Sequence, residues 1–349
     1  MLRHSRAAFL LFSIGFVTIA SSAAAQGQSE SMTSRPATTT VAGDTGLWMV
    51  PTGEVLPAKK WSFSFSRLEG NSGQGFLNIS TFPLTFGVGL GHHTEVFGSW
   101  HVMTRLDRDT RPLFFPGVLA NGTGGGIDVD YPLDRTTFTG SKRGDLWVGA
   151  KVNLLPERSD RAMAFAVRPM IKLPIGDDKA GTSSGKADFS ADAILSTEVS
   201  HMVDLSGYGG ILVRGNPDGY ELTRGLRWGV GAGFPSRLPV RATLELYGER
   251  YNSDTITAPA GLTGADGSQV PTSAVVKSPV YLTLGLTFQL PAGFFVGVGA
   301  NWNLTLAARD EAAGAYESNG FRDKADYLVR FGFHPGTRRT ARTIVEVTP

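Results

Sequence analysis

The residues that could carry acid-base or nucleophilic chemistry are few in this chain, and they are not grouped. Histidine is the most informative, because its ordinary pKa lies close to neutral pH. His92 and His93 are adjacent, His201 and His334 fall at the ends of predicted strands, and His101 falls inside one. None is expected beside a long loop, where a base could reach a bound substrate. We therefore expect no catalytic residue and no enzyme.

The sequence offers equally little evidence for a metal site or a phosphate site. The pairs Asp107/Asp109 and Asp128/Asp130 offer the oxygen ligands that Ca²⁺ takes, but such pairs are more typical of solvated loop acids. The glycine-rich run at 122–126 is not followed by a helical pattern, so it indicates a loop tip rather than a phosphate cradle. We expect no bound metal and no cofactor.

The charged residues are more informative, because they alternate with aliphatic ones. In PVRATLELYGERY, at 239–251, Val240, Ala242 and Leu244 alternate with Arg241, Thr243 and Glu245. A β-strand points successive side chains to opposite faces, so this strand has one aliphatic and one charged face. Most other candidate strands repeat the pattern, and no helical pattern remains to cover the aliphatic faces. Lipid around a closed barrel is then the expected cover.

The alternation predicts twelve strands. They occupy residues 60–68, 76–91, 94–106, 144–154, 162–175, 188–201, 207–215, 224–234, 239–252, 279–290, 293–307 and 325–334. An even number returns the chain to the side from which it started, as in bacterial single-chain barrels. In the second strand, Pro83 interrupts the alternation, and we expect a β-bulge at Phe82–Pro83.

The connections between these strands alternate in length. Short turns are expected at 92–93, 156–161, 202–206, 235–238 and 291–292, and longer loops at 107–143, 176–187, 253–278 and 308–324. Two loops of the second set, 71–74 and 216–223, are shorter. Short turns on one side and long loops on the other are typical of outer-membrane barrels, whose short turns face the periplasm. Both termini are therefore expected in the periplasm.

Composition agrees with an exported barrel. The 349 residues include 44 glycines, 19 prolines and no cysteine, which excludes disulfides and a lipidated N-terminal cysteine. Arg3 and Arg6 precede an apolar run at 7–20, and the alanines at 23–25 form a signal-peptidase pattern, so residues 1–25 are expected to be a signal peptide. Without Arg3 and Arg6 the chain has 31 basic and 31 acidic residues, and nothing suggests a nucleic-acid partner.

The predicted organisation has three further parts. Residues 26–58 form a periplasmic lead-in or partial plug, 59–335 the barrel, and 336–349 a periplasmic tail. Pro51 and Pro57 prevent a continuous regular element in the lead-in. It could be a short strand and turn that feed the barrel, or a segment inside the lumen; of these, we expect a position at the periplasmic rim.

Charged side chains on the inward parity are expected to line the lumen, because a midplane Arg facing lipid costs about 2 to 4 kcal/mol. The predicted lumen-lining residues are Arg67, Glu95, His101, Arg105, Asp145, Lys151, Arg168, Lys172, Asp188, Asp192, Glu198, Arg214, Arg227, Arg241, Glu245, Glu249 and Arg330. Either they line a narrow water-filled pore, where nine bases against seven acids favour anions slightly, or they pair across the lumen and close it. The loop at 107–143 could fold inward as a constriction or lie exposed.

Two stretches resemble a known family. TGLWMVPTGEVLPAKKWSFSFSR at 45–67, followed by GFLNISTFPLTFGVGLGHHTEVFGS at 75–99, is similar to the barrel half of some outer-membrane protein A family members. YLVRFGFHPG at 327–336 is similar to the end of that barrel. The resemblance implies the fold and an outer-membrane location. It does not carry over peptidoglycan anchoring, since this chain ends after a short tail.

The sequence thus predicts an all-β, transmembrane, antiparallel up-and-down barrel of about twelve strands. The aromatic-ending last strand resembles the signal that the barrel-assembly machinery recognises, although a basic tail follows it. Expected partners are outer-membrane lipid and that machinery during insertion. The function expected is a passive porin-like channel for small polar solutes, with a closed, salt-bridged scaffold as the alternative and an outer-membrane enzyme as the third possibility. A soluble two-sheet sandwich is the architectural rival.

Overall fold

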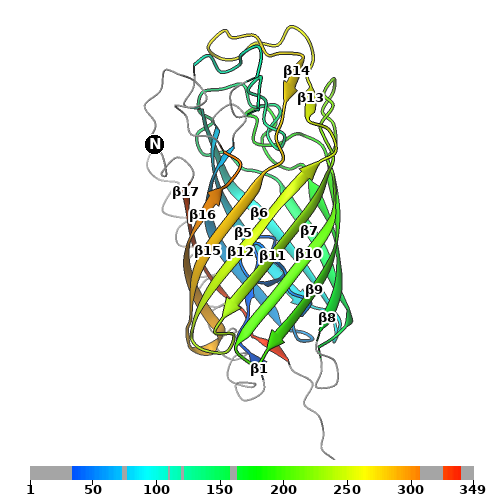
Figure 1. The fold of residues 1–349 in the computed structure, drawn as a ribbon, viewed down its shortest axis with the longest axis vertical. Helices are drawn as coiled ribbons and strands as arrows, with labels where there is room; N and C mark the ends of the chain where they lie inside the picture. Colours follow the sequence, from blue (N-terminus) through cyan, green and yellow to red (C-terminus); the bar gives the residue numbers. More distant parts are fainter. Residues whose placement is uncertain are drawn as a thin grey trace, which may run out of the picture.

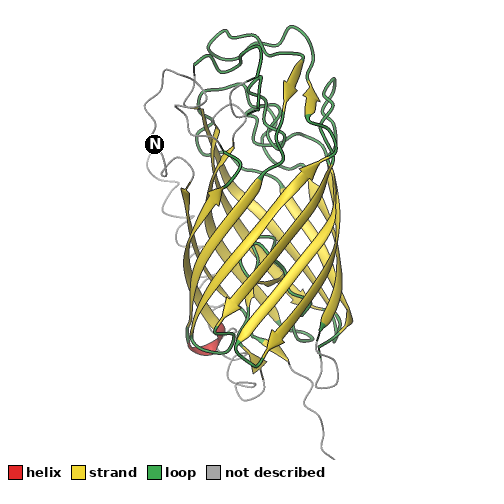
Figure 2. Ribbon diagram, in the orientation of Figure 1, coloured by secondary structure: helices red, strands yellow, loops and turns green. Residues whose placement is uncertain are grey.

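In a computed structural model, the chain forms one closed β-barrel with irregular segments inside it and at one end (Figure 1). The structure describes residues 34–72, 77–108, 111–118, 122–157, 163–306 and 325–338. The signal peptide expected at 1–25 lies outside these ranges, as do the whole loop at 308–324 and most of the tail. Within the described residues, the only helical element is a three-residue turn of 3₁₀ helix, Pro291–Gly293 (Figure 2).

Twelve long strands build the wall. They are β4 (Trp61–Ser72), β5 (Leu77–Gly89), β6 (Thr94–Arg108), β7 (Leu146–Leu155), β8 (Ala164–Leu173), β9 (Asp188–Val199), β10 (Val203–Val213), β11 (Gly225–Phe234), β12 (Val240–Tyr251), β15 (Val280–Gln289), β16 (Phe294–Asn303) and β17 (Ala325–Phe333). The short pairs are β1 (Ser34–Arg35) with β18 (Thr337–Arg338), β2 (Thr38–Thr39) with β3 (Thr45–Gly46), and β13 (Thr255–Thr257) with β14 (Ser273–Val275).

The twelve strands are antiparallel neighbours in chain order, and the last closes on the first. β17 pairs with β4 from Val329↔Arg67 to Phe333↔Phe63, which completes the ring. The predicted fold class and strand number are confirmed, and the two-sheet sandwich is wrong. Predicted and observed strand ends differ by a few residues, most at β10, which begins at Val203 because the preceding turn is tighter than expected.

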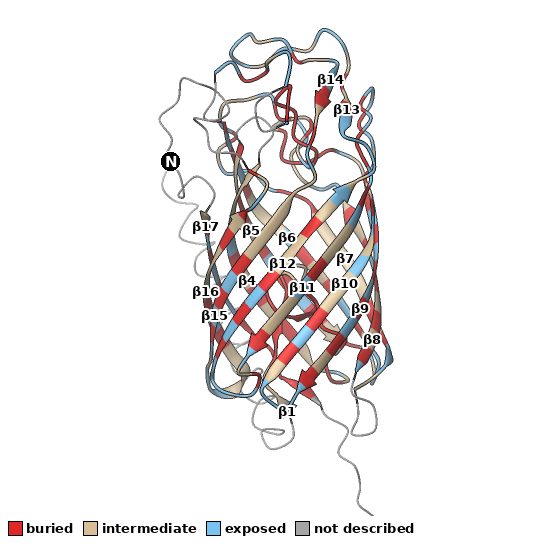
Figure 3. Ribbon diagram, in the orientation of Figure 1, coloured by how far each residue is buried: buried red, intermediate tan, exposed pale blue. Residues whose placement is uncertain are grey.

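The outer face of the wall is apolar along its height. On β12, Val240 and Leu244 are exposed while Arg241 and Glu245 are buried, and the other strands repeat this alternation (Figure 3). At the end with short turns, Trp61 stacks with Phe63 and contacts Phe333 at a centroid distance of 4.8 Å. Such an apolar band with aromatic residues at its edge fits a lipid bilayer.

Among the described residues, no helix combines the length and apolarity needed to cross a membrane.

A register shift occurs at Phe82/Pro83, as predicted, but the extra residue belongs to the partner strand. Phe82 pairs with Met103 and Pro83 with His101, which leaves Val102 of β6 without an opposite residue. The side chains of β6 therefore change face at Val102. Glu95 and Ser99 are buried below the bulge, and Thr104, Leu106 and Arg108 are buried above it.

The long loops form a compact cap over the end of the barrel opposite the short turns. Buried side chains from three loops and from the β13–β14 pair make a small apolar core of their own, which comprises Leu113, Phe114, Ile127, Val129, Tyr220, Leu222, Ile256, Ala258, Val270, Ala274 and Val276. The loops therefore pack against one another around an apolar core. From the sequence we had expected only that they are long and polar.

Candidate functional site

Residues 35–57, hereafter the plug, lie inside the barrel rather than at its rim. Leu47, Trp48, Val50 and Leu56 are almost completely buried, and the plug contacts inward side chains from β4 around to β17. Figure 1 shows the segment in blue within the ring of strands. The rim position that we expected is therefore wrong, and the alternative of a segment in the lumen describes the structure.

Glu245 of β12 holds the centre of the plug. Its two carboxylate oxygens accept hydrogen bonds from three consecutive backbone amides, those of Trp48, Met49 and Val50, at 2.9, 2.8 and 2.7 Å. A carboxylate is a strong acceptor for backbone amides that have no partner in a helix or sheet. The central bend of the plug is thus fixed by one side chain of the wall.

A buried ion-pair network holds the β2–β3 hairpin of the plug. Lys151 of β7 lies 3.2 Å from Asp44 and 2.9 Å from Glu95, and it donates to the Thr45 carbonyl at 2.6 Å. Arg168 of β8 bridges Asp44 at 3.1 Å and Asp192 at 2.7 Å. All these side chains are nearly inaccessible, so each charge depends on the others for compensation.

Arg330 of β17 clamps the other side of the plug. Its guanidinium donates to the carbonyls of Thr39 at 2.9 Å and Leu47 at 2.8 Å, and it lies 3.8 Å from the centroid of the Trp48 ring. The Trp48 ring fits over Gly285 and Gly297, where an added Cβ would meet it; at Gly297 the distance to Trp48 Cζ2 would be 2.7 Å. Inward glycines of the wall therefore make the space that the plug fills.

Replacing Gly285 by valine is expected to displace Trp48, because the new Cβ would overlap the indole ring. Chymotrypsin cleavage after Trp48, followed on a gel with the protein in liposomes, should become at least about tenfold faster, corresponding to about 1.4 kcal/mol or more. Gly209→Ala is the control, since nothing lies within 4 Å of an added Cβ there. Equal cleavage of the two variants would contradict the packing described for Trp48.

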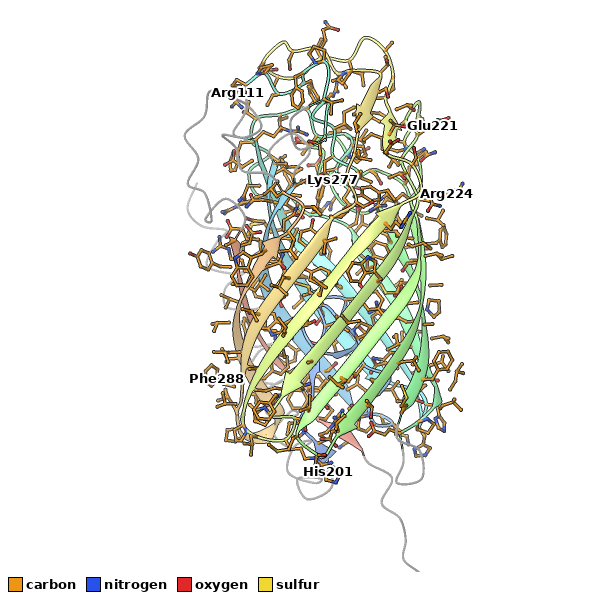
Figure 4. The ribbon with its side chains drawn as sticks, in the orientation of Figure 1. Arg111, His201, Glu221, Arg224, Lys277 and Phe288 are labelled. Carbon is orange, nitrogen blue, oxygen red and sulfur yellow. The ribbon has the colours of Figure 1, made fainter. Side chains whose placement is uncertain are left out.

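A second network holds the plug where it enters the barrel. Arg35 pairs with Asp204 of β10 and Glu54 of the plug, and it lies 3.6 Å from Glu198 of β9. Arg237, in the turn between β11 and β12, binds Glu198 at 2.6 Å. In Figure 4, His201 is labelled at this end of the barrel, the end with the short turns, whereas Arg224 and Lys277 lie toward the cap.

Between the plug and the cap lies a cavity of about 480 Å³. One side, formed by β8 to β12, carries Lys172, Arg214 and Arg227 with their acids. On the opposite side, the described residues of β15, β16, β17, β4 and β5 that line the cavity include no Lys or Arg; among them are Tyr281, Asn301, Leu328, Leu68 and Ile79. Lys277, in the loop before β15, also lines the cavity. Val41, Ala42 and Met49 of the plug form the floor. The strands on one side of the cavity therefore contribute charged residues of both signs, and those on the other side contribute mainly apolar and uncharged polar residues.

The loop at 107–143 folds over the cavity. Arg108 is buried and binds Asp134 at 2.9 Å, while Asp130 binds Arg214 of β10 at 2.8 Å. Burial alone would raise the pKa of Asp130, but the charge of Arg214 holds it below its usual value. Burial, together with the neighbouring Asp130, raises the pKa of Asp128. Of the two positions left open for this loop, the inward one is observed.

The two aspartates should respond oppositely to neutralisation. Asp130→Asn is expected to loosen the loop by weakening the bond to Arg214, whereas Asp128→Asn removes a charge whose burial is unfavourable and should leave the loop unchanged or firmer. Trypsin cleavage at Arg135 and Lys142 in intact liposomes measures the difference. Faster cleavage of Asp128→Asn than of Asp130→Asn would contradict the assigned pairing.

Most predicted lumen residues are buried or line the cavity: Glu95, His101, Asp145, Lys151, Arg168, Lys172, Asp188, Asp192, Glu198, Arg214, Arg227, Arg241, Glu245, Glu249 and Arg330. Two do not face inward. Arg67, 47% exposed, shares the outer face with Phe63 and Phe65 and pairs with Glu69 at 3.1 Å. Arg105 is exposed because the Val102 bulge turns it outward.

Sequence reasoning missed several charged residues of this site, including Glu54 and Arg237 of the second network. Arg35 and Asp44 lie in the plug, Asp204 lies in a stretch assigned to a turn, and Arg108 lies beyond the bulge. A change of hydrophobic parity on β6 after His101 was the signal that could have found Arg108. The inward glycines at 231, 285 and 297 were the signal for a filled lumen.

The histidines are not brought together. His101 lines the cavity, and His334 lies beside the plug, 3.1 Å from Thr45 Oγ1. Within the described ranges, no three His, Asp or Glu side chains are grouped as a metal site.

No family model matches the chain, and no curated protein matches it. The resemblance to outer-membrane protein A barrels therefore stays a prediction. Among solved structures, an outer-membrane channel from Pseudomonas putida F1 has a TM-score of 0.51 at 10% identity, over 80% of this chain and 97% of that one. The NanC porin (0.42, 7% identity, 79% and 98%) and the KdgM porin with disordered oligogalacturonate (0.41, 6%, 78% and 98%) score lower. The Pseudomonas likeness shows the barrel fold.

Proposed function

We propose that this protein is an outer-membrane channel for small polar solutes and that the plug keeps it closed at rest. The observation that carries the proposal is the chemistry of the plug surface. The wall holds the plug by carboxylates, cations and hydroxyls, as in the contacts of Glu245, Lys151 and Ser99. Water can take over such contacts when the plug moves, whereas a permanent core would be expected to be apolar. The resulting lumen would be lined by charges of both signs.

The outer-membrane location is part of the proposal, and the apolar outer face with its interior charges supports it. An N-terminal signal peptide would deliver the chain. Pairing of β1 with β18 brings the two ends of the described chain together at the end with short turns, which supports a periplasmic position for both termini. A barrel like that of the outer-membrane protein A family is compatible with this location and orientation. The proposed function includes no catalytic activity.

A second candidate is a permanently closed scaffold. The buried pairing of Lys151 and Arg168 with acids of both plug and wall favours it, because removing either partner would leave an uncompensated charge. In that case the plug would act as the core of the barrel and would not leave.

Deletion of residues 34–58 separates the two candidates. The channel proposal expects the intact protein to be closed most of the time in a planar bilayer and the shortened barrel to show steady unit conductance. Slower gel migration on boiling would verify that the shortened barrel is folded. A folded but silent barrel would overturn the channel and favour the scaffold.

A further inference from the structure

A row of tyrosines crosses the wall of the cavity, hereafter the tyrosine band. In the strand register, Tyr208 of β10 lies opposite Gly229 of β11, Gly229 lies opposite Tyr247 of β12, and Tyr247 lies opposite Tyr281 of β15. Directly opposite residues of neighbouring strands share one face of the sheet at the same height. All three tyrosines line the cavity. They therefore form a level aromatic band on the inner wall.

The tyrosine band offers both apolar surface and polar groups. The rings of Tyr247 and Tyr281 stack with their centroids 5.3 Å apart and their planes at 22°. Gly229 leaves room for the ring of Tyr208, since an added Cβ would lie 2.6 Å from Tyr208 Cε1. A tyrosine combines a broad apolar ring with a hydroxyl at its edge. The band therefore suits a ligand that has an apolar face and a polar rim.

Asn301 of β16 has unused hydrogen-bonding capacity beside the band. The residue is 5% exposed, and its side-chain oxygen accepts from the Tyr247 hydroxyl at 3.0 Å and from Thr283 Oγ1 at 2.8 Å. In the part of the chain that the structure describes, its amide nitrogen has no hydrogen-bond partner, and the same is true of the Tyr281 hydroxyl. Both residues line the cavity, and both atoms are accessible from it. A ligand with hydroxyl groups would supply the missing partners.

The cations of the cavity wall are already paired, which disfavours an anionic ligand. Lys172 contacts two carboxylates at 2.6 and 3.5 Å, and Arg214 contacts two at 2.6 and 2.8 Å. An anion would have to displace one of these carboxylates, and it would lose its own hydration on entering the cavity. The wall therefore gives no net attraction to a negative charge.

A cationic ligand is disfavoured by the guanidinium groups at the band itself. Those of Arg168 and Arg227 lie 5.6 and 5.9 Å from the centroid of the Tyr208 ring. The two arginines share one carboxylate, that of Asp192, at 2.7 and 3.5 Å. Positive charge thus already occupies an aromatic face that could otherwise attract a cation. The band favours an uncharged ligand.

We propose that the cavity binds a neutral sugar of one or two rings. The apolar C–H face of the sugar packs against Tyr247 and Tyr281, and its hydroxyls bond to the amide nitrogen of Asn301 and the hydroxyl of Tyr281. A hydroxyl both donates and accepts, so it can satisfy both groups. A volume of about 480 Å³ lies in the range of about 300–1,000 Å³ of small-molecule sites. That this sugar is also the transported solute rests on the proposed channel function, whereas its binding to the cavity does not.

Binding of radiolabelled maltose, lactose and sucrose to the full chain in lipid nanodiscs tests the site, because neutral sugars do not partition into lipid. Saturable binding of at least one of them is expected. Tyr281→Phe removes a hydroxyl without a partner in the protein, so the barrel should stay folded while the affinity falls at least about threefold. Tyr281→Leu also removes the ring and should lower the affinity at least about tenfold.

Tyr327→Phe and Tyr327→Leu are the matched controls, since Tyr327 lies on the outer face and is 70% exposed. Both should bind sugar as the unmodified protein does. Absence of saturable binding for all three sugars would overturn the site. Unchanged affinity in a folded Tyr281→Leu barrel would also overturn it.

Competition against the bound sugar tests the charge class. Glucose, glucuronate and glucosamine share one ring and differ in charge. The two charged compounds should compete at least about tenfold more weakly than glucose, which corresponds to about 1.4 kcal/mol. Stronger competition by glucuronate would indicate an anion site, and stronger competition by glucosamine a cation site; either result overturns the neutral class.

These binding measurements involve no current and no movement of the plug, so the site and the channel can fail separately. A liposome-swelling assay of the barrel without residues 34–58 tests the solute assignment, with the bound sugar as the permeant. Swelling is expected at a rate above that of empty liposomes. A barrel that conducts ions but does not admit the sugar would overturn the solute assignment and leave both the channel and the binding site standing.

Discussion

Replacing Glu245 by leucine is expected to raise the open probability of the channel about a hundredfold. The substitution leaves the amides of Trp48, Met49 and Val50 without their acceptor inside the barrel. Each buried amide without a partner costs about 1–3 kcal/mol, so the seated plug should lose at least about 3 kcal/mol. A tenfold change in population corresponds to about 1.4 kcal/mol. Single-channel recording in a planar bilayer measures the effect.

Thr243→Val is the control for this experiment. Thr243 lies on the same face of β12, and its hydroxyl donates to the Gly285 carbonyl rather than to the plug. The control should keep the behaviour of the unmodified protein. If the leucine variant folds and stays as closed as the control, Glu245 does not hold the plug.

Replacing Lys151 by methionine is expected to lower the stability of the barrel by about 3–5 kcal/mol, the usual effect of removing one partner of a buried ion pair. Methionine has nearly the length of lysine, so the space is filled while Glu95 and Asp44 lose a cation. Unfolding in urea, followed by gel migration, should show an earlier midpoint.

The double variant Lys151→Met, Glu95→Gln identifies the cause. Neutralising Glu95 removes one of the charges left without compensation, so the double variant should be less destabilised than the sum of the two single variants. Simple additivity would mean that Lys151 acts through packing rather than through charge.

The barrel could be predicted from the sequence because its rule is local. In strands such as Val240–Tyr251, hydrophobic and polar residues alternate with a period of two. The charged residues must face inward, because each would be costly on the face that contacts lipid. Most of the charged lumen followed from this rule. The rule fails where a single extra residue reverses which side chains face inward. Because of the bulge at Val102, the rule places Arg105 in the lumen, where it does not lie, and does not find Arg108, which is buried.

The plug could not be placed by a local rule. Its hairpin has short pairings, Thr38↔Gly46 and Thr39↔Thr45, and most of its bonds reach residues far along the chain, such as Glu245 and Arg330. A partner that is distant in sequence leaves no periodic trace in either segment.

The pairing of β1 with β18 sets the order in which a mechanical load would release the plug. A pull on the N-terminal end acts first on two residue pairs, Ser34↔Arg338 and Arg35↔Thr337, and next on the charges around Arg35. Glu245 and Arg330 would bear force only after these have yielded. Because the bonds fail in sequence, extraction would require less peak force than simultaneous rupture, and the plug would leave from its N-terminal side.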